Sequence, residues 1–327
     1  MAFSLLGTGS PLLDIQIRAT DEFLAKHVPG SKGGMEPISV ADIDRIIAAS
    51  FVEPGIFPGG AAGNTVFALS RFGVKCALRG KLGKDKYQEK YFEFCRQNQV
   101  NTKELIISDT NSTGCCLALV TDDAERTMRS ALGVSLDLSD EDISSASYSE
   151  YDAVLVEGFM AYSGKLDVMV RCAKEHGRFV ILDLASFEIA EKFRDLFIQL
   201  SSMVDMVVAN EAEAQAFTGK NNPEDSLAEL KKYFSAAVVK CGAKGVWFSG
   251  KDEEFFTPAF PVENVVDTTA AGDLWLAGYI CGRDRGKSER TAVKYGTVFS
   301  AKIISHAGSI LTEKDVEELT FLLEDMI

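Results

Sequence analysis

The segment VVDTTAAGDLWLAGY, residues 265–279, contains the features from which the fold can be inferred. It begins with two valines typical of a strand end, passes through a turn of small residues, and continues as an apolar run with helical character. Asp267 and Asp273 stand on either side of the turn. The backbone amides that open such a helix are not covered by large side chains, and together with the helix dipole they favour a bound anion. The segment therefore predicts an anion site at the start of a helix.

Asp273 is the first indication of chemistry, because it stands at the rim of this anion site. Ala270, Ala271 and Gly272 leave room for a phosphate to approach the backbone closely. A carboxylate that faces a phosphate is unfavourable unless it accepts a proton from a hydroxyl that attacks the phosphorus. The alternative is that Asp273 only complements the positive end of the helix. The segment by itself leaves both interpretations open.

The chain after residue 150 alternates apolar strands with amphipathic helices, which indicates a parallel sheet covered on both faces. Strands are predicted at 152–158, 178–186, 204–210, 236–242 and 245–250, with earlier core strands at 2–8 and 74–80. Helices are predicted at 187–200, 211–218, 224–234, 272–282, 288–305 and 312–323.

The first 135 residues have a different pattern. Segments 14–20, 115–123 and 125–132 show the partial alternation of a half-exposed antiparallel sheet. Core-like segments separate them, so we expect a small sheet, formed near 14–56 and 105–135, that projects from the body as a lid. No linker or change of composition marks a second unit, and residues 1–327 are therefore predicted to form a single domain.

Two N-terminal segments carry polar groups suited to binding hydroxyls. In the run FPGGAAGN, Gly59 and Gly60 permit close approach to the backbone, and Asn64 can hydrogen-bond to a polyol. In GTGSPLLD, Asp14 follows a turn, where its carboxylate can accept hydrogen bonds from paired hydroxyls. The alternatives are a tightly packed strand–helix turn and a solvated acid at a strand end.

Two C-terminal segments suit a nucleotide and its metal ion. In VVANEAEA, Asn210 ends a strand and Glu213 falls in the first turn of the next helix. Such oxygens can hold a hydrated Mg²⁺, although acids at a helix start are also common for electrostatic reasons. In VVKCGAKG, Lys240, Gly242 and Gly245 lie between two strands, either as a plain hairpin or as a loop that closes on a nucleotide.

The composition narrows the class of protein further. A net charge of −14 argues against a broad nucleic-acid surface, and no apolar run is long enough to predict a membrane span. The seven cysteines are scattered, which indicates free thiols in a reducing cytoplasm. There is no G-x-x-x-x-G-K-[ST] loop, and GTGSPL fails G-x-G-x-x-G at Leu12, so P-loop kinases and ordinary dinucleotide-dependent dehydrogenases are disfavoured.

In this order, the segments resemble the ribokinase-like, or phosphofructokinase-B type, family of carbohydrate and nucleoside kinases. The resemblance covers nearly the whole chain and is most specific in DTTAAGD, with support from the GG-AAG-N and NEAE motifs. Trp275 stands where phenylalanine is more usual, and Lys240 where threonine or serine is frequent. The resemblance implies a three-layer α/β/α fold with a mostly parallel central sheet and a small β-sheet lid.

The resemblance also implies roles for individual residues. The catalytic base would be Asp273, with an anion hole at Ala270, Ala271 and Gly272. The acceptor would be bound by Asp14, Gly59, Gly60 and Asn64. ATP would lie near Asn210, Lys240, Gly242 and Gly245, with Mg²⁺ held through water by Asn210 and Glu213, and with a monovalent cation such as K⁺ at Asp267 and Thr269.

The implied function is ATP-dependent transfer of the γ-phosphate to a hydroxymethyl group of a sugar, which the motif ERTM favours. A nucleoside kinase of the same fold is the alternative, to which GTGSPLLDI and the insertion at 26–56 point. A non-catalytic binding homologue is a third interpretation, although it would not need an intact Asp273. A homodimer through the lid is also expected. A phosphorylated acceptor would have to be reached by Arg79, Lys81, Arg126 or Arg129.

Overall fold

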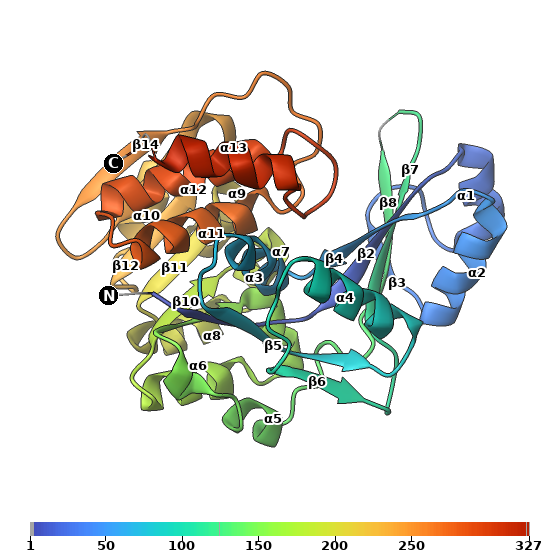
Figure 1. The fold of residues 1–327 in the computed structure, drawn as a ribbon, viewed down its shortest axis with the longest axis horizontal. Coiled ribbons are helices and arrows are strands. Elements are labelled where there is room, and N and C mark those ends of the chain that lie inside the picture. The colour runs from blue at the N-terminus through green and yellow to red at the C-terminus, as the bar shows by residue number, and fades with distance from the viewer. Residues whose placement is uncertain (1–2, 124, 325, 327) are drawn as a thin grey trace.

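The computed structural model describes residues 3–123, 125–324 and 326, and has a large α/β body from which a smaller sheet projects on one side (Figure 1). The ribokinase-like three-layer fold with a mostly parallel sheet is thereby confirmed. Ala2, where the first predicted strand begins, lies outside the described residues. Within them, no helix combines the length and hydrophobicity that a membrane span requires.

The large sheet has nine strands in the order β14-β13-β12-β11-β10-β9-β1-β5-β6. All neighbours pair in parallel except β12 with β13 and β13 with β14. The strands are β1 (Leu5–Thr8), β5 (Cys76–Gly83), β6 (Leu105–Ser108), β9 (Ala153–Glu157), β10 (Phe179–Asp183), β11 (Met206–Asn210), β12 (Ala236–Lys240), β13 (Gly245–Ser249) and β14 (Glu254–Pro258).

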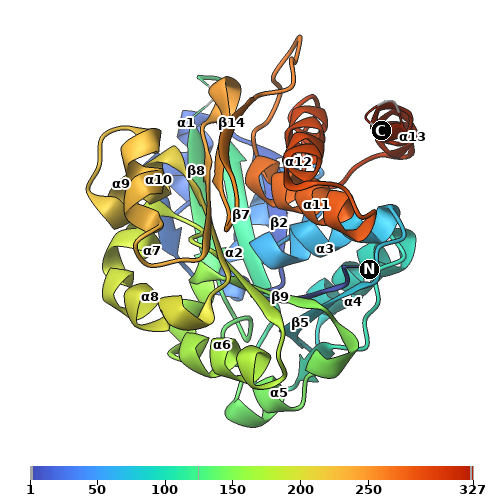
Figure 2. The same cartoon turned by 90° about the vertical axis from the view of Figure 1, so that its left-hand side faces the viewer.

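Helices cover both faces of this sheet, because successive apolar side chains of each strand point to opposite sides (Figure 2). Val154, for example, is buried in one core and Leu155 in the other. One face is covered by α3 (Ala61–Arg71), α4 (Lys86–Gln97), α11 (Ala271–Asp284) and α12 (Glu289–Ile303), and α13 (Glu313–Glu324) packs on the outside of α12. The other is covered by α5 (Asp140–Ser144), α6 (Leu166–Glu175), α7 (Phe187–Lys192), α8 (Arg194–Leu200), α9 (Glu211–Thr218) and α10 (Pro223–Leu230).

The small sheet has the order β3-β8-β7-β2-β4. Its strands are β2 (Leu12–Arg18), β3 (Met35–Pro37), β4 (Gly55–Gly59), β7 (Gly114–Val120) and β8 (Arg126–Ala131). Two expectations are corrected here. The segment 105–108 is not part of this sheet, since it pairs with β5 at the edge of the large one. The sheet is also mixed, because β2 and β7 run in parallel.

The back face of the small sheet is covered by α1 (Asp21–His27) and α2 (Val40–Ser50), as Figure 1 shows. Ile43 and Ile46 of α2 are fully buried there. Arg129 of β8 is also buried, and its guanidinium donates to the carbonyls of Pro29 at 2.7 Å and Ser31 at 2.8 Å. The insertion between β2 and β4 therefore covers one face of the small sheet.

Candidate active site

A cavity of about 950 Å³ lies where the carboxyl ends of β10, β11 and β12 meet the start of α11. This is the edge of a parallel sheet at which ligands usually bind. The predicted site residues that line it are Asn210, Glu213, Lys240, Gly242, Gly245, Ala270, Ala271, Gly272 and Asp273. The remaining ones, Asp14, Gly59, Gly60, Asn64, Asp267 and Thr269, do not line this cavity and are described separately below.

The start of α11 presents backbone amides to the cavity. Ala270 precedes the helix in the left-handed conformation, with φ of 60°, and caps it without a side-chain hydrogen bond. The amide of Ala271 donates to the carbonyl of Thr268 at 3.2 Å. The amides of Gly272 and Asp273 have no acceptor among the described residues. The amide of the cap residue Ala270 also has no acceptor among these residues, so of the three predicted anion-hole residues only Ala271 has its amide engaged.

Asp273 is fixed by a contact with the helix α3. The Nδ2 of Asn64 donates to Oδ2 of Asp273 at 2.8 Å, and Thr65 Oγ1 donates to the Asp273 carbonyl at 3.1 Å. Burial and the nearby charge of Asp183 raise the pKa of Asp273 to about 7, although the Asn64 hydrogen bond and the charge of Lys240 oppose the rise. The carboxyl group is thus able to change protonation near neutral pH.

Asn64, which the sequence predicts to bind a hydroxyl of the acceptor, lies beside Asp273. Its side-chain nitrogen is used by Asp273, and its Oδ1 is buried with no hydrogen-bond partner among the described residues. Only 5% of Asn64 is exposed. Asn64 therefore orients Asp273 and presents one free acceptor atom beside it.

Two acids at the ends of buried strands lie in or beside the site, and neither was predicted from the sequence. Asp183 ends β10 and lies 3.4 Å from Nζ of Lys240, measured from its Oδ2. Glu157 ends β9 and accepts hydrogen bonds from the amide of Ala62 at 2.9 Å and from the amide of Ser10 at 2.6 Å. An acid directly after an apolar strand run, at the carboxyl edge of a parallel sheet, is the pattern that could have identified them.

Lys240 extends from the end of β12 to the first turn of α11. A Cβ added to Gly272 would lie 2.8 Å from Nζ of Lys240, so the glycine leaves the space that the ammonium group needs. Burial alone would lower the pKa of Lys240, but Asp183, Glu213 and Asp273 together raise it above its ordinary value. The side chain is therefore a buried, charged ammonium group.

Asn210 and Glu213 form a reciprocal cap at the start of α9. The Asn210 side chain accepts from the Glu213 amide at 2.9 Å, and the Glu213 carboxylate accepts from the Asn210 amide at 2.8 Å and from Nδ2 at 2.6 Å. Burial and the charge of Asp183 raise the pKa of Glu213 to about 7. Asn210 and Glu213 therefore cap α9, and both residues also line the cavity.

Asp14 lies on the small sheet beside Gly59. A Cβ on Gly59 would lie 2.5 Å from Oδ2 of Asp14, so a side chain at this position would displace the carboxylate. Gly60 follows with φ of 95°, a conformation that favours glycine. Burial raises the pKa of Asp14 to about 6, with the charge of Arg126 opposing and that of Asp267 adding to the rise.

Asp267 and Thr269 lie under Arg126, at the point where the small sheet approaches the body. The Asp267 carboxylate accepts from the amide of Thr269 at 2.9 Å, from its hydroxyl at 2.7 Å and from the amide of Gly308 at 3.3 Å. Arg126 Nη1 lies 4.0 Å from the same carboxylate and 3.4 Å from Thr269 Oγ1.

The cations considered for a phosphorylated acceptor are mostly engaged elsewhere. Arg79 is buried and donates to the Asp142 carbonyl and to Glu104. Lys81 pairs with Asp142 at 2.6 Å, and Arg129 is buried behind the small sheet. Of the four, only Arg126 faces the loop that precedes α11.

Comparison with known proteins identifies the family. A family model described as pfkB family carbohydrate kinase matches residues 50–315. The chain is 26% identical over 284 residues to a ribokinase of Haemophilus influenzae, covering 81% of this chain and 90% of the relative. It is 24% identical over 339 positions to an adenosine kinase of Saccharomyces cerevisiae, covering 94% and 96%. The crystal structure of adenosine kinase from Sinorhizobium meliloti matches with a TM-score of 0.84 and 26% identity, covering 98% of this chain and 100% of that one.

The chain belongs to the pfkB family of carbohydrate kinases. It is an ATP-dependent carbohydrate or nucleoside kinase, which transfers a phosphoryl group to a hydroxyl. Kinases of this family use ATP, generally with Mg²⁺. The resemblance to the ribokinase-like kinases is therefore confirmed, and the chain is not a non-catalytic binding homologue.

The raised pKa of Asp273 leads to a prediction about stability. A carboxyl whose pKa rises on folding destabilises the folded state progressively as the pH increases from the unfolded pKa to the folded pKa, and by a constant amount above the folded pKa. Asp273→Asn should therefore increase the free energy of unfolding by about 1–3 kcal/mol at pH 8, and the gain should shrink as the pH falls through 7 towards 4. Urea unfolding at several pH values measures this.

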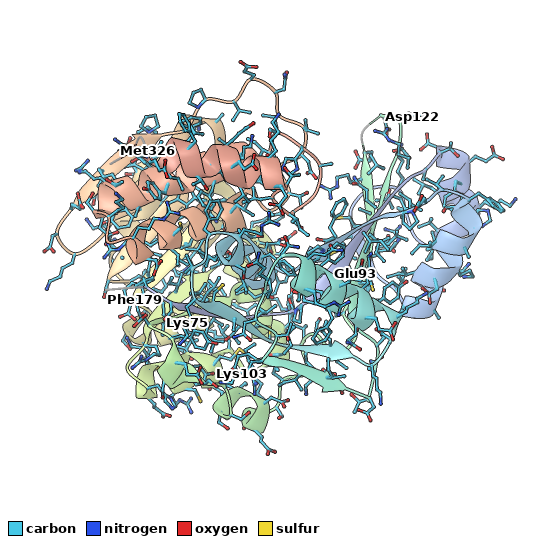
Figure 3. All side chains as sticks on the ribbon, in the orientation of Figure 1. Lys75, Glu93, Lys103, Asp122, Phe179 and Met326 are labelled. Atoms are coloured by element: carbon cyan, nitrogen blue, oxygen red, sulfur yellow. The ribbon has the colours of Figure 1, made fainter. Side chains whose placement is uncertain are left out.

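The matched control is Asp122→Asn, at the exposed tip of the β7–β8 hairpin (Figure 3). We expect it to change the free energy of unfolding by less than about 0.5 kcal/mol at every pH. A loss of stability at pH 8 in Asp273→Asn would contradict the electrostatic account of the site.

Proposed function

We propose that Asp273 is the general base of a kinase that phosphorylates a hydroxymethyl group of a ribose-containing acceptor. The observation that carries the proposal is the position of Asp273, whose carboxylate is held by Asn64 next to two backbone amides without acceptors. The γ-phosphoryl group binds at the amides of Gly272 and Asp273. The acceptor oxygen attacks phosphorus, its proton passes to Asp273, and the bond to the ADP oxygen breaks.

ATP occupies the 950 Å³ cavity, with its phosphates directed at α11. The loop through Gly242 and Gly245 lines the same cavity and supports the placement of the nucleoside part of ATP there. Asn210 and Glu213 line the cavity and fit a Mg²⁺ that is held through water, because each of their cap oxygens accepts one hydrogen bond and can accept a second from metal-bound water. When bound, Mg²⁺ supplies positive charge to the phosphates.

Asp267 and Thr269 fit a monovalent cation poorly. The Asp267 carboxylate already accepts three hydrogen bonds, and the Arg126 guanidinium balances its charge. The proposed mechanism therefore contains no step that depends on K⁺.

The acceptor binds between the small sheet and the body, where Asp14 accepts hydrogen bonds from its hydroxyls. The sequence favoured a free sugar, but the surroundings of Asp14 favour a nucleoside. Phe57 on β4 and Cys116 on β7 are its register partners, and Met128 lies on the same face of the sheet. Three side chains there are half-buried: Phe57, Cys116 and Met128. A nucleobase has flat apolar faces that can cover such side chains, whereas a free sugar has no such aromatic face.

The covered back face of the small sheet supports a monomer in place of the homodimer through the lid. The seven cysteines are all free thiols, which supports a reducing cytoplasmic compartment. A single sharp size-exclusion peak at twice the monomer mass would contradict the proposal that the protein is a monomer.

The role of Asp273 is tested by the variant Asp273→Asn. We expect kcat to fall about 10²–10⁴-fold, the usual effect of losing a general base, while ATP binding persists. For the wild type, kcat/KM should decrease below about pH 7, because the raised pKa leaves the base protonated there. A coupled ADP-release assay over a panel of sugars and nucleosides measures both. More than about a tenth of wild-type kcat in the variant would rule out Asp273 as the base.

The role of Glu213 is tested through the metal requirement. Glu213→Gln should raise the Mg²⁺ concentration needed for half-maximal activity about tenfold, as expected for loss of a residue that orients metal-bound groups, and should leave the acceptor KM unchanged. Glu211→Gln, two residues earlier on the same helix and paired with Lys244, is the control. An unchanged Mg²⁺ titration would restrict Glu213 to its capping role.

The acceptor site is tested by Asp14→Ala. Because hydrogen bonds to a charged group contribute about 1.5–3 kcal/mol, kcat/KM for the acceptor should fall about ten- to a hundredfold per lost bond. The KM for ATP should stay within about twofold, since Asp14 does not line the ATP cavity. Asp122→Ala, in the turn that joins β7 to β8, is the control (Figure 3).

The same assay separates the two acceptor classes. A nucleoside should be used with at least about tenfold higher kcat/KM than the free sugar, and Phe57→Ala should reduce that preference. Equal or better use of the free sugar by the wild type would restore the carbohydrate interpretation.

A further inference from the structure

We infer that Lys240 is a catalytic residue that binds the transferred phosphoryl group, and that Asp183 is the counter-ion that holds it in place before ATP arrives. The inference goes beyond the assignment of Asp273 as base and depends on the chain being an ATP-dependent kinase.

The first argument is the charge of the cavity. Among the described residues that line it, Lys240 is the only cation, whereas Asp183, Glu213 and Asp273 are acids. Phosphoryl transfer depends on positioning and on neutralising the charge that spreads over the phosphoryl oxygens. A cavity that carries three acids needs a cation at the point where that charge develops.

The second argument is the location of the ammonium group. A positive charge at the positive end of a helix is unfavourable, yet Nζ of Lys240 lies against the first turn of α11, beside Gly272. This placement adds to the positive potential of the two amides that lack acceptors. The lysine and the helix start therefore attract the same anion.

The third argument is the loose contact with Asp183. The distance of 3.4 Å exceeds the roughly 2.7–2.9 Å of a strong charge-assisted hydrogen bond. Oδ1 of Asp183 is separately engaged by the Ala185 amide at 2.8 Å, so the acid is fixed while the lysine is held only by one long contact. The side chains of Lys240 and Asp183 line the cavity with exposures of only 14% and 8%, so both are largely shielded from bulk solvent.

In the transfer step, Lys240 stays protonated and its ammonium donates to a non-bridging oxygen of the γ-phosphoryl group. The new bond joins the acceptor oxygen to phosphorus, the bond to the bridging oxygen of ADP breaks, and the acceptor proton goes to Asp273. Lys240 then returns to Asp183 when the products leave.

The competing explanation is that Lys240 only neutralises buried acids. The test uses Lys240→Gln, Asp183→Asn, the double variant, and the control Lys244→Gln on the neighbouring exposed turn. We expect Lys240→Gln to lower kcat by about 10²-fold or more, as for loss of one transition-state donor, and Lys244→Gln to stay within about twofold. The double variant should regain the thermal stability lost in Lys240→Gln but should not regain kcat.

A binding experiment separates this inference from the proposed function, because it needs no acceptor. Calorimetric titration of Lys240→Gln should show ATP binding weakened about tenfold or more and AMP binding unchanged, since only ATP carries the γ-phosphoryl group. Recovery of kcat in the double variant, or equal weakening of ATP and AMP, would overturn the inference. Absence of turnover in the wild type would instead count against the proposed acceptor.

Discussion

The hydrogen bond from Asn64 to Asp273 is the contact on which the organisation of the site depends. It joins α3, which leaves the small sheet, to α11, which opens with two amides that lack acceptors. Glu157 fixes two nearby segments that connect the small sheet to the body, because its carboxylate accepts hydrogen bonds from the amides of Ser10 and Ala62. The anion site, the carboxylate and the approach from the small sheet are therefore set by a few buried polar contacts, which cost much more to break than exposed ones.

The same contacts explain why the site combines several acids with raised pKa values. Asp273 and Glu213 are buried near Asp183, and each has its pKa raised to about 7. Such an arrangement lowers stability at neutral pH, a common cost at functional sites. A ligand that brings its own positive charge, such as a metal–nucleotide complex, would relieve this repulsion.

The sequence predicted the features that depend on local pattern. Apolar runs and helix punctuation located the parallel strands and α9, and the small residues before Asp273 located the start of α11. Features that depend on tertiary contacts were missed. The hydrogen bond from Asn64 to Asp273 joins positions 209 residues apart, and the parallel pairing of β2 with β7 joins segments about a hundred residues apart. Asp183 and Glu157 were not predicted as site residues, because only the pairing of β10 with β9 places the two acids side by side.

The most direct test of the account is a crystal structure with Mg²⁺, a non-hydrolysable ATP analogue and a bound acceptor. The account predicts that the γ-phosphoryl group accepts hydrogen bonds from the amides of Gly272 and Asp273, with the Asp273 carboxylate within hydrogen-bond reach of the acceptor hydroxyl. A γ-phosphoryl group bound away from the first turn of α11, or an acceptor hydroxyl out of reach of Asp273, would contradict it.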